Sequence, residues 1–318
     1  MFVRRKIPWQ WTLAVTWPSL TYFLLVAVLV HLLRGQVYQT GLEIPFEPVV
    51  ILGTALSIFL GFKNNEAYGR WWEARIIWGL AVNYSRAWGR QVLTLLRAPE
   101  HERAELQGFQ RVMVLRHGAF IHALRVYLRR TKSYPQELPE DHLSARNDYV
   151  ICSSLLADED YARMLAADNP PNMLLQLQGE DLARARERGW ASEYVLVQLD
   201  QTLVELNNIQ GRSERIKKTP MPRPYSYFQR VILHVHGTLL PFAFVTELGW
   251  PMIPISLAVS FVFLVLDIIG SRTEDPFENR VDDTPLSALS RTIERNLREQ
   301  LGETELPPNI EPVGGVLM

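Results

Sequence analysis

The stretch of sequence that decides the fold is residues 49–75, VVILGTALSIFLGFKNNEAYGRWWEAR. Its first part, residues 49–62, is apolar but too short to cross a bilayer core of roughly 30 Å as a helix by itself. No helix breaker separates it from the polar residues 63–66. Polar side chains at membrane depth normally face a bundle interior or a water-filled path. The pattern predicts a helix that continues through this polar run, and a helix that leaves the membrane at Lys63 fits it equally well.

The composition leaves room for both a membrane part and a water-exposed part. Of the 318 residues, 47% are hydrophobic and 21% are charged, and the mean hydropathy is −0.03. A chain that lay wholly in a membrane would be far more apolar, so the spans must share it with a substantial soluble region. The formal net charge of −1 argues against a general nucleic-acid binder, which carries a basic excess or a basic face.

Three further segments are apolar like membrane spans: residues 11–33, 231–245 and 252–269. The first follows a basic start and has no small-x-small cleavage site after it, so we expect an uncleaved span rather than a signal peptide. A tight turn is expected around Gly249. With the helix that begins in residues 49–62, the chain is predicted to have four spans.

The remainder of the chain is predicted to be helical and soluble. Residues 76–220 are charged and carry apolar residues at helical spacing, and alternating strand patterns are scarce. Residues 193–209 and 286–301 are each predicted to form a helix. The expected domains are residues 1–85 with spans one and two, 86–224 as a helical region, 225–270 with spans three and four, and 271–318 as a tail.

The distribution of basic residues predicts the orientation. Arg4, Arg5 and Lys6 precede the first span, Arg34 is the one basic residue between spans one and two, and the turn between spans three and four has none. By the positive-inside rule, both termini and the large middle region are expected in the cytoplasm of a cell whose plasma (inner) membrane the chain crosses.

Residues with catalytic or metal-binding chemistry are few. No phosphate loop, nucleophile elbow or zinc motif is present in the sequence. His234 and His236 point about 200° apart on a helix, so they cannot converge on one metal. The acidic residues between Glu274 and Asp283 are interrupted by Arg and Pro, and we expect a solvated loop there. The single cysteine, Cys152, is expected to be a buried small side chain.

Three stretches of the chain, in this order, resemble signatures of the bestrophin family in its bacterial form. They are residues 60–75 with Trp78-Gly79 and residues 83–86, residues 214–222 with Tyr225, and residues 275–279 with residues 282–286. The resemblance implies an all-α membrane protein, with four transmembrane helices per subunit and a cytosolic helical body, assembled as a homopentamer around a central pore. It implies an ion channel rather than an enzyme, with no cofactor and with small monovalent ions and membrane lipid as its partners.

The resemblance also implies the pore residues. The family's second membrane helix lines a narrow neck with apolar side chains one turn apart, and matching residues 61–62 places Thr54, Ile58 and Phe62 there. A weaker local match assigns a cytosolic constriction to Met173. Thr54 departs from the apolar pattern, so the outer end of the neck is expected to be wider or wetter. The acidic clasp that binds calcium in eukaryotic members is degraded here, which argues against calcium gating.

The charges near the neck bear on ion selectivity. Glu66 follows Phe62 by one turn, and a ring of such carboxylates attracts cations. Glu43 and Glu47 are expected to act likewise at the outer mouth, whereas Lys63 is expected to oppose Glu66. Eukaryotic bestrophins conduct anions, and bacterial members do not all follow them. Chloride is the family's default ion, and a cation channel remains open.

Two other classes of function stay open at this point. One is a membrane scaffold without conduction, which the polar run in residues 63–66 disfavours. The other is a membrane-embedded enzyme or metal-dependent transporter that uses His234, His236, Glu247 or Asp267. An intramembrane acid is a functional candidate by default, but the place of Asp267 near the end of a span favours an interfacial or inter-subunit contact.

Overall fold

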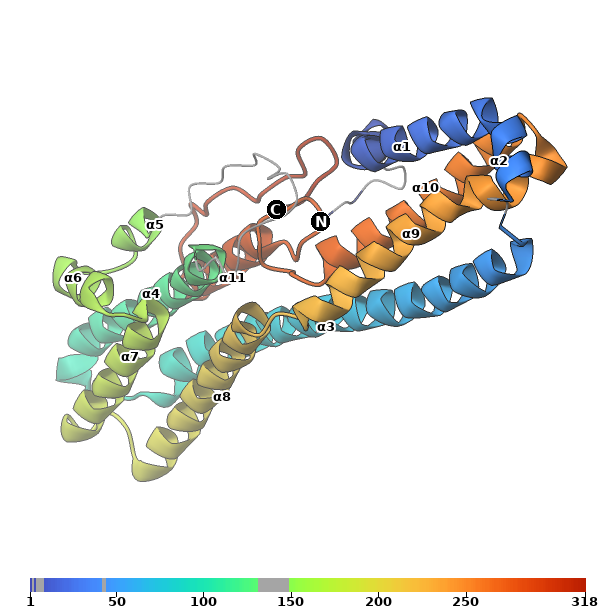
Figure 1. The fold of residues 1–318 in the computed structure, drawn as a ribbon. Coiled ribbons are helices and arrows are strands. Elements are labelled where there is room, and N and C mark those ends of the chain that lie inside the picture. Colours follow the sequence, from blue (N-terminus) through green and yellow to red (C-terminus); the bar gives the residue numbers. More distant parts are fainter. Residues whose placement is uncertain (2, 4–8, 42–43, 131–148) are drawn as a thin grey trace. The chain divides into compact units, whose positions relative to one another are not determined.

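The structure is a computed structural model that describes residues 1, 3, 9–41, 44–130 and 149–318 (Figure 1). All the secondary-structure elements in these described residues are helices, and the β-structure there is one isolated bridge between Val313 and Val316. The predicted all-α class is therefore confirmed. The chain divides into two compact units, which we call the membrane unit (Arg4–Trp71 and Pro220–Asp275) and the body (Met1–Val3, Trp72–Thr219 and Pro276–Met318).

The membrane unit contains the four apolar helices that the sequence predicts. They are α1 (Trp9–Leu32), the first part of α3 (Phe46–Leu95), α9 (Arg223–Leu248) and α10 (Met252–Thr273), and each is long and apolar enough to cross a membrane. The short helix α2 (Arg34–Thr40) follows α1. A continuous helix through the polar run is confirmed, because α3 continues for 50 residues and belongs to both units; the depth of residues 63–66 in the membrane stays a prediction.

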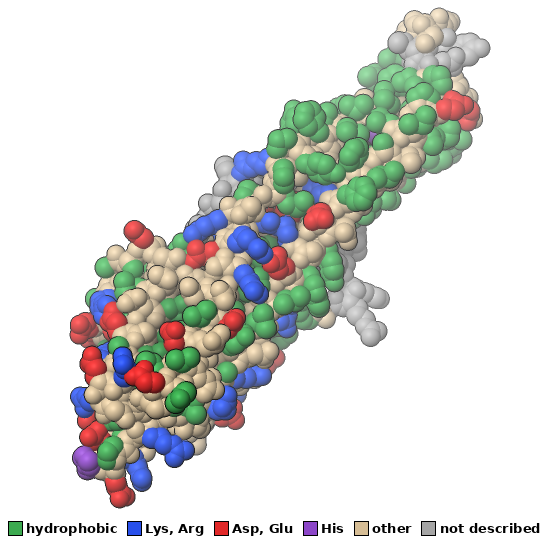
Figure 2. All heavy atoms as spheres, turned by 90° about the horizontal axis from the view of Figure 1, so that it is seen from below, with side chains coloured by type: hydrophobic (Ala, Val, Ile, Leu, Met, Phe, Trp, Pro, Cys, Tyr) green, Lys and Arg blue, Asp and Glu red, His purple; other side chains and the backbone are tan. Residues whose placement is uncertain are grey.

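Apolar side chains of four helices hold the membrane unit together. Helices α1, α9 and α10 pack against one another (Figure 1). Phe23 of α1 is buried in a cluster with residues of α3, α9 and α10, namely Leu56, Leu60, Leu233 and Leu264. A Cβ atom at Gly237 would lie 2.5 Å from the Phe23 ring, so only glycine lets α9 approach α1 so closely there. In Figure 2 hydrophobic side chains cover most of the visible surface of this unit.

The turn between α9 and α10 is set by Gly249. Its φ of +58° lies in the left-handed region, where side chains with a Cβ atom are strained. The Met252 backbone N–H donates to the Gly249 carbonyl at 3.3 Å and starts α10. The predicted tight turn at this position is confirmed.

The body is a set of helices around α4 (Arg103–Arg130). Its other elements are η1 (Glu100–Glu102), α5 (Val150–Ser153), α6 (Asp158–Ala166), α7 (Pro170–Glu187), α8 (Glu193–Lys218), α11 (Leu286–Gln300) and the second part of α3. Helix α4 packs against α7, α8 and α11. The core includes the fully buried Trp78, Trp88 and Phe120. The helices predicted to start at residues 193 and 286 begin there in the structure, but the first continues to Lys218, well beyond its predicted end at Ile209.

The C-terminal segment of the body departs from the sequence-based expectation. The acidic stretch is not a solvated loop, because Asp283 is only 3% exposed. Glu278 forms an ion pair with Lys217 of α8, and both side chains are buried. The charges come from parts of the chain far apart in sequence, so inspection of the acidic stretch alone did not find this packing. The predicted domain limits at residues 85, 224 and 270 concern where the chain meets the membrane, and they stay predictions.

Candidate ion pathway

The predicted neck residues lie along one exposed face of α3 in the membrane unit. Thr54, Ile58, Phe62 and Glu66 are all exposed, with Ile58 at 54% and Phe62 at 63%. Four residues advance an α-helix by about 6 Å and bring the next side chain nearly above the last. We call this face the α3 stripe (Thr54, Ile58, Phe62 and Glu66). Its members share a face as their spacing predicts, and their role in a pore stays a prediction.

The opposite face of α3 is buried, and this fixes the direction of the stripe. Leu56 and Leu60 are fully buried in the cluster around Phe23. Nearer the start of the helix, a Cβ atom at Gly53 would lie 2.7 Å from Nε2 of His236, so the His236 ring of α9 packs directly against the α3 backbone there. Because one face of α3 packs against the unit's other helices, the stripe must face away from them.

A buried ion pair lies on the packed face, next to the stripe in sequence. Lys63 Nζ donates to Asp267 Oδ1 at 2.9 Å and to Ser271 Oγ at 2.7 Å, and its side chain is 0% exposed. Arg230 Nε lies 3.6 Å from Asp267 Oδ2. A buried ammonium is tolerated only when it is paired and hydrogen-bonded, and here α10 supplies both partners.

This ion pair corrects one expectation and adds a contact to another. Lys63 does not oppose Glu66, because its charge is buried on the packed face and is compensated by Asp267. Asp267 pairs with Lys63 and Arg230 of its own chain, and its expected interfacial or inter-subunit contact stays a prediction. The pairing was missed from sequence because the two residues are 204 positions apart. The sequence nevertheless held a signal for this pairing. Lys63 and Asp267 carry opposite charges, and each lies near the end of an apolar segment.

Glu66 carries the charge of the stripe. Within the described part of the chain it has no ion-pair partner, and its side chain is exposed. Glu47, at the start of α3, is exposed as well, whereas Glu43 lies outside the described residues. Thr54 uses its hydroxyl within its own helix, because Oγ1 donates to the Val50 carbonyl at 2.9 Å.

Met173 lies in the body, on the first turns of α7. Its side chain is half-buried and packs against the core of the body, and its assignment to a cytosolic constriction stays a prediction. The neighbouring helix α8 presents two far more exposed apolar side chains, Tyr194 at 90% and Val197 at 66%. The start of α8 is apolar at every position from Tyr194 to Val197, so the sequence alone did not show which of these side chains the fold leaves exposed.

The two histidines of α9 engage different neighbours. His234 Nδ1–H donates to the Arg230 carbonyl at 2.8 Å. The His236 ring is buried and meets the Phe263 ring edge-on, with 5.2 Å between ring centroids. Across the described ranges, no group of three or more His, Cys, Asp or Glu side chains is arranged to hold a metal ion.

Cys152 has the environment that the sequence predicts. It is fully buried in the body, and its thiol donates to the Ala119 carbonyl at 3.5 Å. Burial raises the pKa of the thiol to about 12. The thiolate, which is the reactive form, is therefore scarce at neutral pH.

The fold and the α3 stripe define a class: a multi-pass, all-helical membrane protein with a helical body outside the spans. The model of the Bacterial/Fungal Bestrophin protein family matches residues 11–299. The chain belongs to this family, as its signature stretches predicted.

Relatives and solved structures agree with this assignment. The chain is 34% identical to the voltage-dependent anion channel-forming protein YneE of Escherichia coli K12, over 86% of this chain and 82% of the relative. It is 33% identical to the voltage-dependent anion channel-forming protein RSc3414 of Ralstonia nicotianae, over 81% of this chain and 78% of the relative. The crystal structure of a bacterial bestrophin homolog from Klebsiella pneumoniae superposes with a TM-score of 0.79 at 31% identity, and covers 90% of this chain and 98% of that one.

Proposed function

We propose that the chain forms a bestrophin-type ion channel, a homopentamer in the inner membrane with both termini in the cytoplasm. Small monovalent ions pass along the α3 stripe. One observation carries the proposal. The stripe exposes the apolar Ile58 and Phe62 and, one turn later, the Glu66 carboxylate, which has no ion-pair partner among the described residues. A face turned to lipid tolerates the first two side chains but not the third, whereas a face turned to a water-filled pore accommodates all three.

The neck works as a hydrophobic constriction. Rings of Ile58 and Phe62 offer an ion no replacement for its hydration shell, so the constriction excludes ions when it dries and passes them when it is wet. Thr54 lies about 12 Å before Phe62 along the helix and makes the outer end more polar. Met173 is proposed as a second constriction on the cytosolic side. The mechanism involves no catalytic residue and no resident metal.

The sign of the ion follows from two considerations that oppose each other. The relatives in Escherichia coli and Ralstonia are named as anion channel-forming proteins, which makes chloride the leading proposal. Glu66 favours the alternative of cation conduction, because the nearby Lys63 is already neutralised by Asp267. Five carboxylates one turn below the neck would raise the local concentration of cations and repel anions.

The reversal potential of the purified protein in a planar bilayer tests the proposal. A tenfold KCl gradient gives about 59 mV for a perfectly selective channel, with the sign set by the permeant ion. Chloride selectivity confirms the leading proposal, and potassium selectivity that is lost in Glu66→Gln confirms the alternative. The matched control is Glu100→Gln, in the body, whose side chain is 91% exposed and which should leave the potential unchanged. Protein that is inserted in the bilayer but carries no current refutes conduction.

A further inference from the structure

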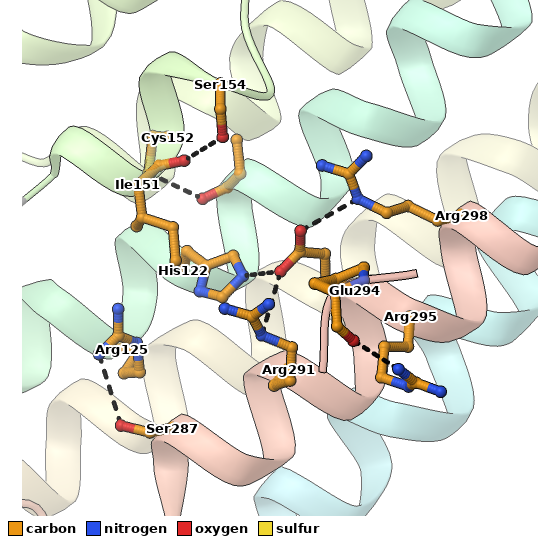
Figure 3. Close-up of polar contacts among 12 residues, drawn as sticks. His122, Arg125, Ile151, Cys152, Ser154, Ser287, Arg291, Glu294, Arg295 and Arg298 are labelled. Atoms are coloured by element: carbon orange, nitrogen blue, oxygen red, sulfur yellow. Dashed lines mark hydrogen bonds and ion pairs between the residues drawn. The ribbon is translucent and has the colours of Figure 1, made fainter. Parts of the chain in front are cut away.

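Two arginines are buried side by side in the body, away from the proposed ion pathway. Arg125 and Arg129 of α4 are four residues apart and therefore share a helix face. Each is only 6% exposed. Both donate to the same hydroxyl, Ser287 Oγ in the first turn of α11, at 3.5 Å from Arg125 Nη1 and 2.7 Å from Arg129 Nη1. Figure 3 shows Arg125 directed at Ser287.

No acid in the described part of the chain neutralises these two charges at ion-pair distance. Glu294 of α11 is engaged elsewhere, since it lies 3.0 Å from both His122 Nε2 and Arg298 Nε (Figure 3). Asp283 attracts Arg129 from beyond that distance, but one of its oxygens accepts the Arg280 backbone N–H at 3.1 Å. Burial also raises the pKa of Asp283 to about 7, so it is partly protonated at neutral pH.

The arginines therefore carry positive charge that Asp283 compensates only in part. Arginine stays protonated at neutral pH, and burial of an unpaired cation is costly. Burial and the neighbouring Arg125 lower the pKa of Arg129 to about 9, which reflects the same deficit of negative charge. The positive end of the α11 dipole adds to it, because Ser287 lies in that helix's first turn.

The hydrogen-bonding capacity is also incomplete. The Nε atoms of Arg125 and Arg129 are buried, and neither finds an acceptor among the described residues. Ser287 Oγ accepts from both guanidinium groups, which leaves its own proton to donate. Two N–H groups and one O–H group thus remain for an acceptor that the described chain does not supply.

We propose that Arg125, Arg129 and Ser287 bind a small monovalent anion of the halide type, with chloride as the cellular occupant. The anion accepts from the two Nε–H groups and from the Ser287 hydroxyl, and it neutralises part of the buried charge. A small ion fits better than an organic phosphate, because both arginine side chains are almost completely enclosed. The site does not depend on conduction, since all three residues belong to the body.

Thermal unfolding of the full-length protein in detergent tests the proposal. Potassium gluconate is replaced stepwise by potassium chloride at constant ionic strength, because gluconate is too large for the site. The midpoint should rise with chloride and saturate in the wild type, and the rise should disappear in Arg129→Gln and Arg125→Gln. Arg103→Gln, at the exposed start of α4 with 66% of its side chain accessible, is the matched control and should keep the rise. Phe62→Ala should also keep it, which separates this site from ions in the proposed neck.

A second measurement covers the case in which the arginine variants do not fold. Crystals of the wild-type protein grown in bromide should show anomalous scattering within hydrogen-bond reach of both guanidinium groups. A wild-type midpoint that is equal in chloride and gluconate overturns the proposal. A rise that survives in both arginine variants, or the absence of bromide from this position, overturns it as well.

Discussion

The substitution Lys63→Met probes the buried ion pair beside the α3 stripe. It removes the ammonium that donates to Asp267 at 2.9 Å and to Ser271 at 2.7 Å. Among the described residues, Asp267 then keeps only Arg230, whose side chain is 41% exposed and 3.6 Å away. Both members of the pair are buried, at 0% and 8% exposure, so solvent screens their interaction little. Removal of one partner of such a pair costs about 3–5 kcal/mol, mostly because a buried charge is left uncompensated.

The assay is denaturant unfolding in detergent, with a double variant as the decisive comparison. Lys63→Met should lower the free energy of unfolding by about 3–5 kcal/mol, whereas Lys63→Met combined with Asp267→Leu should recover most of that loss, because no charge remains buried. Lys218→Met is the matched control. Its Nζ pairs with Glu214 and also donates to Tyr127 Oη at 3.1 Å, and its side chain is 46% exposed, so the expected cost is about 0–1 kcal/mol.

Two results would refute this reasoning. A loss in Lys63→Met no larger than that in Lys218→Met would show that the pair is not buried as the structure has it. A double variant as unstable as the single one would show that packing of the lysine stem, and not charge, accounts for the loss. In either case the charge-based account of the pair would fail, while the direction of the stripe would still rest on the burial of Leu56 and Leu60.

Three further predictions concern the neck and the body. Phe62→Ala should widen the proposed neck and raise the single-channel conductance several-fold in a planar bilayer; an unchanged conductance would remove Phe62 from the constriction. Burial raises the pKa of Asp283 from 3.8 to about 7, so the folded state binds more protons than the unfolded state between about pH 4 and 7. Stability should therefore fall as the pH rises through this window, by up to about 4 kcal/mol, and Asp283→Asn should abolish that dependence. Cys152 should resist maleimide at pH 8 in the folded protein and react fully after denaturation, whereas rapid labelling of the native protein would contradict its burial.

The path of the backbone was largely predictable, because local signals determine it. Apolar length set the four spans, and the lack of a breaker after Phe62 set the continuous helix α3. Start signals also fall where helices begin: Ser192 accepts from the Val195 N–H at 3.4 Å at the start of α8. Helical spacing alone placed Thr54, Ile58 and Phe62 on one face.

What could not be predicted depends on contacts between distant segments or between chains. The acidic stretch looks solvated when its charges are counted along the sequence. In the fold, Lys217 of α8 pairs with Glu278 and the Arg280 backbone N–H donates to Asp283, so these residues are buried instead. The role of Met173 and the number of subunits depend on surfaces that meet only in an assembly, and a single chain carries no local signal for them.

The polar run after Phe62 shows how one helix satisfies two demands at once. A lysine at a simple membrane exit extends its ammonium to water and headgroups, but Lys63 is fully buried on α10. Asn64 follows it toward α10, where a Cβ atom at Gly270 would lie 2.2 Å from Asn64 Oδ1, so the Asn64 amide lies directly against the Gly270 backbone. Asn65 and Glu66 are exposed. The run is therefore divided between a packed face, which sets the rotation of α3, and an open face. Any ion selectivity that this segment confers must come from Asn65 and Glu66, since the charge of Lys63 is already compensated by Asp267.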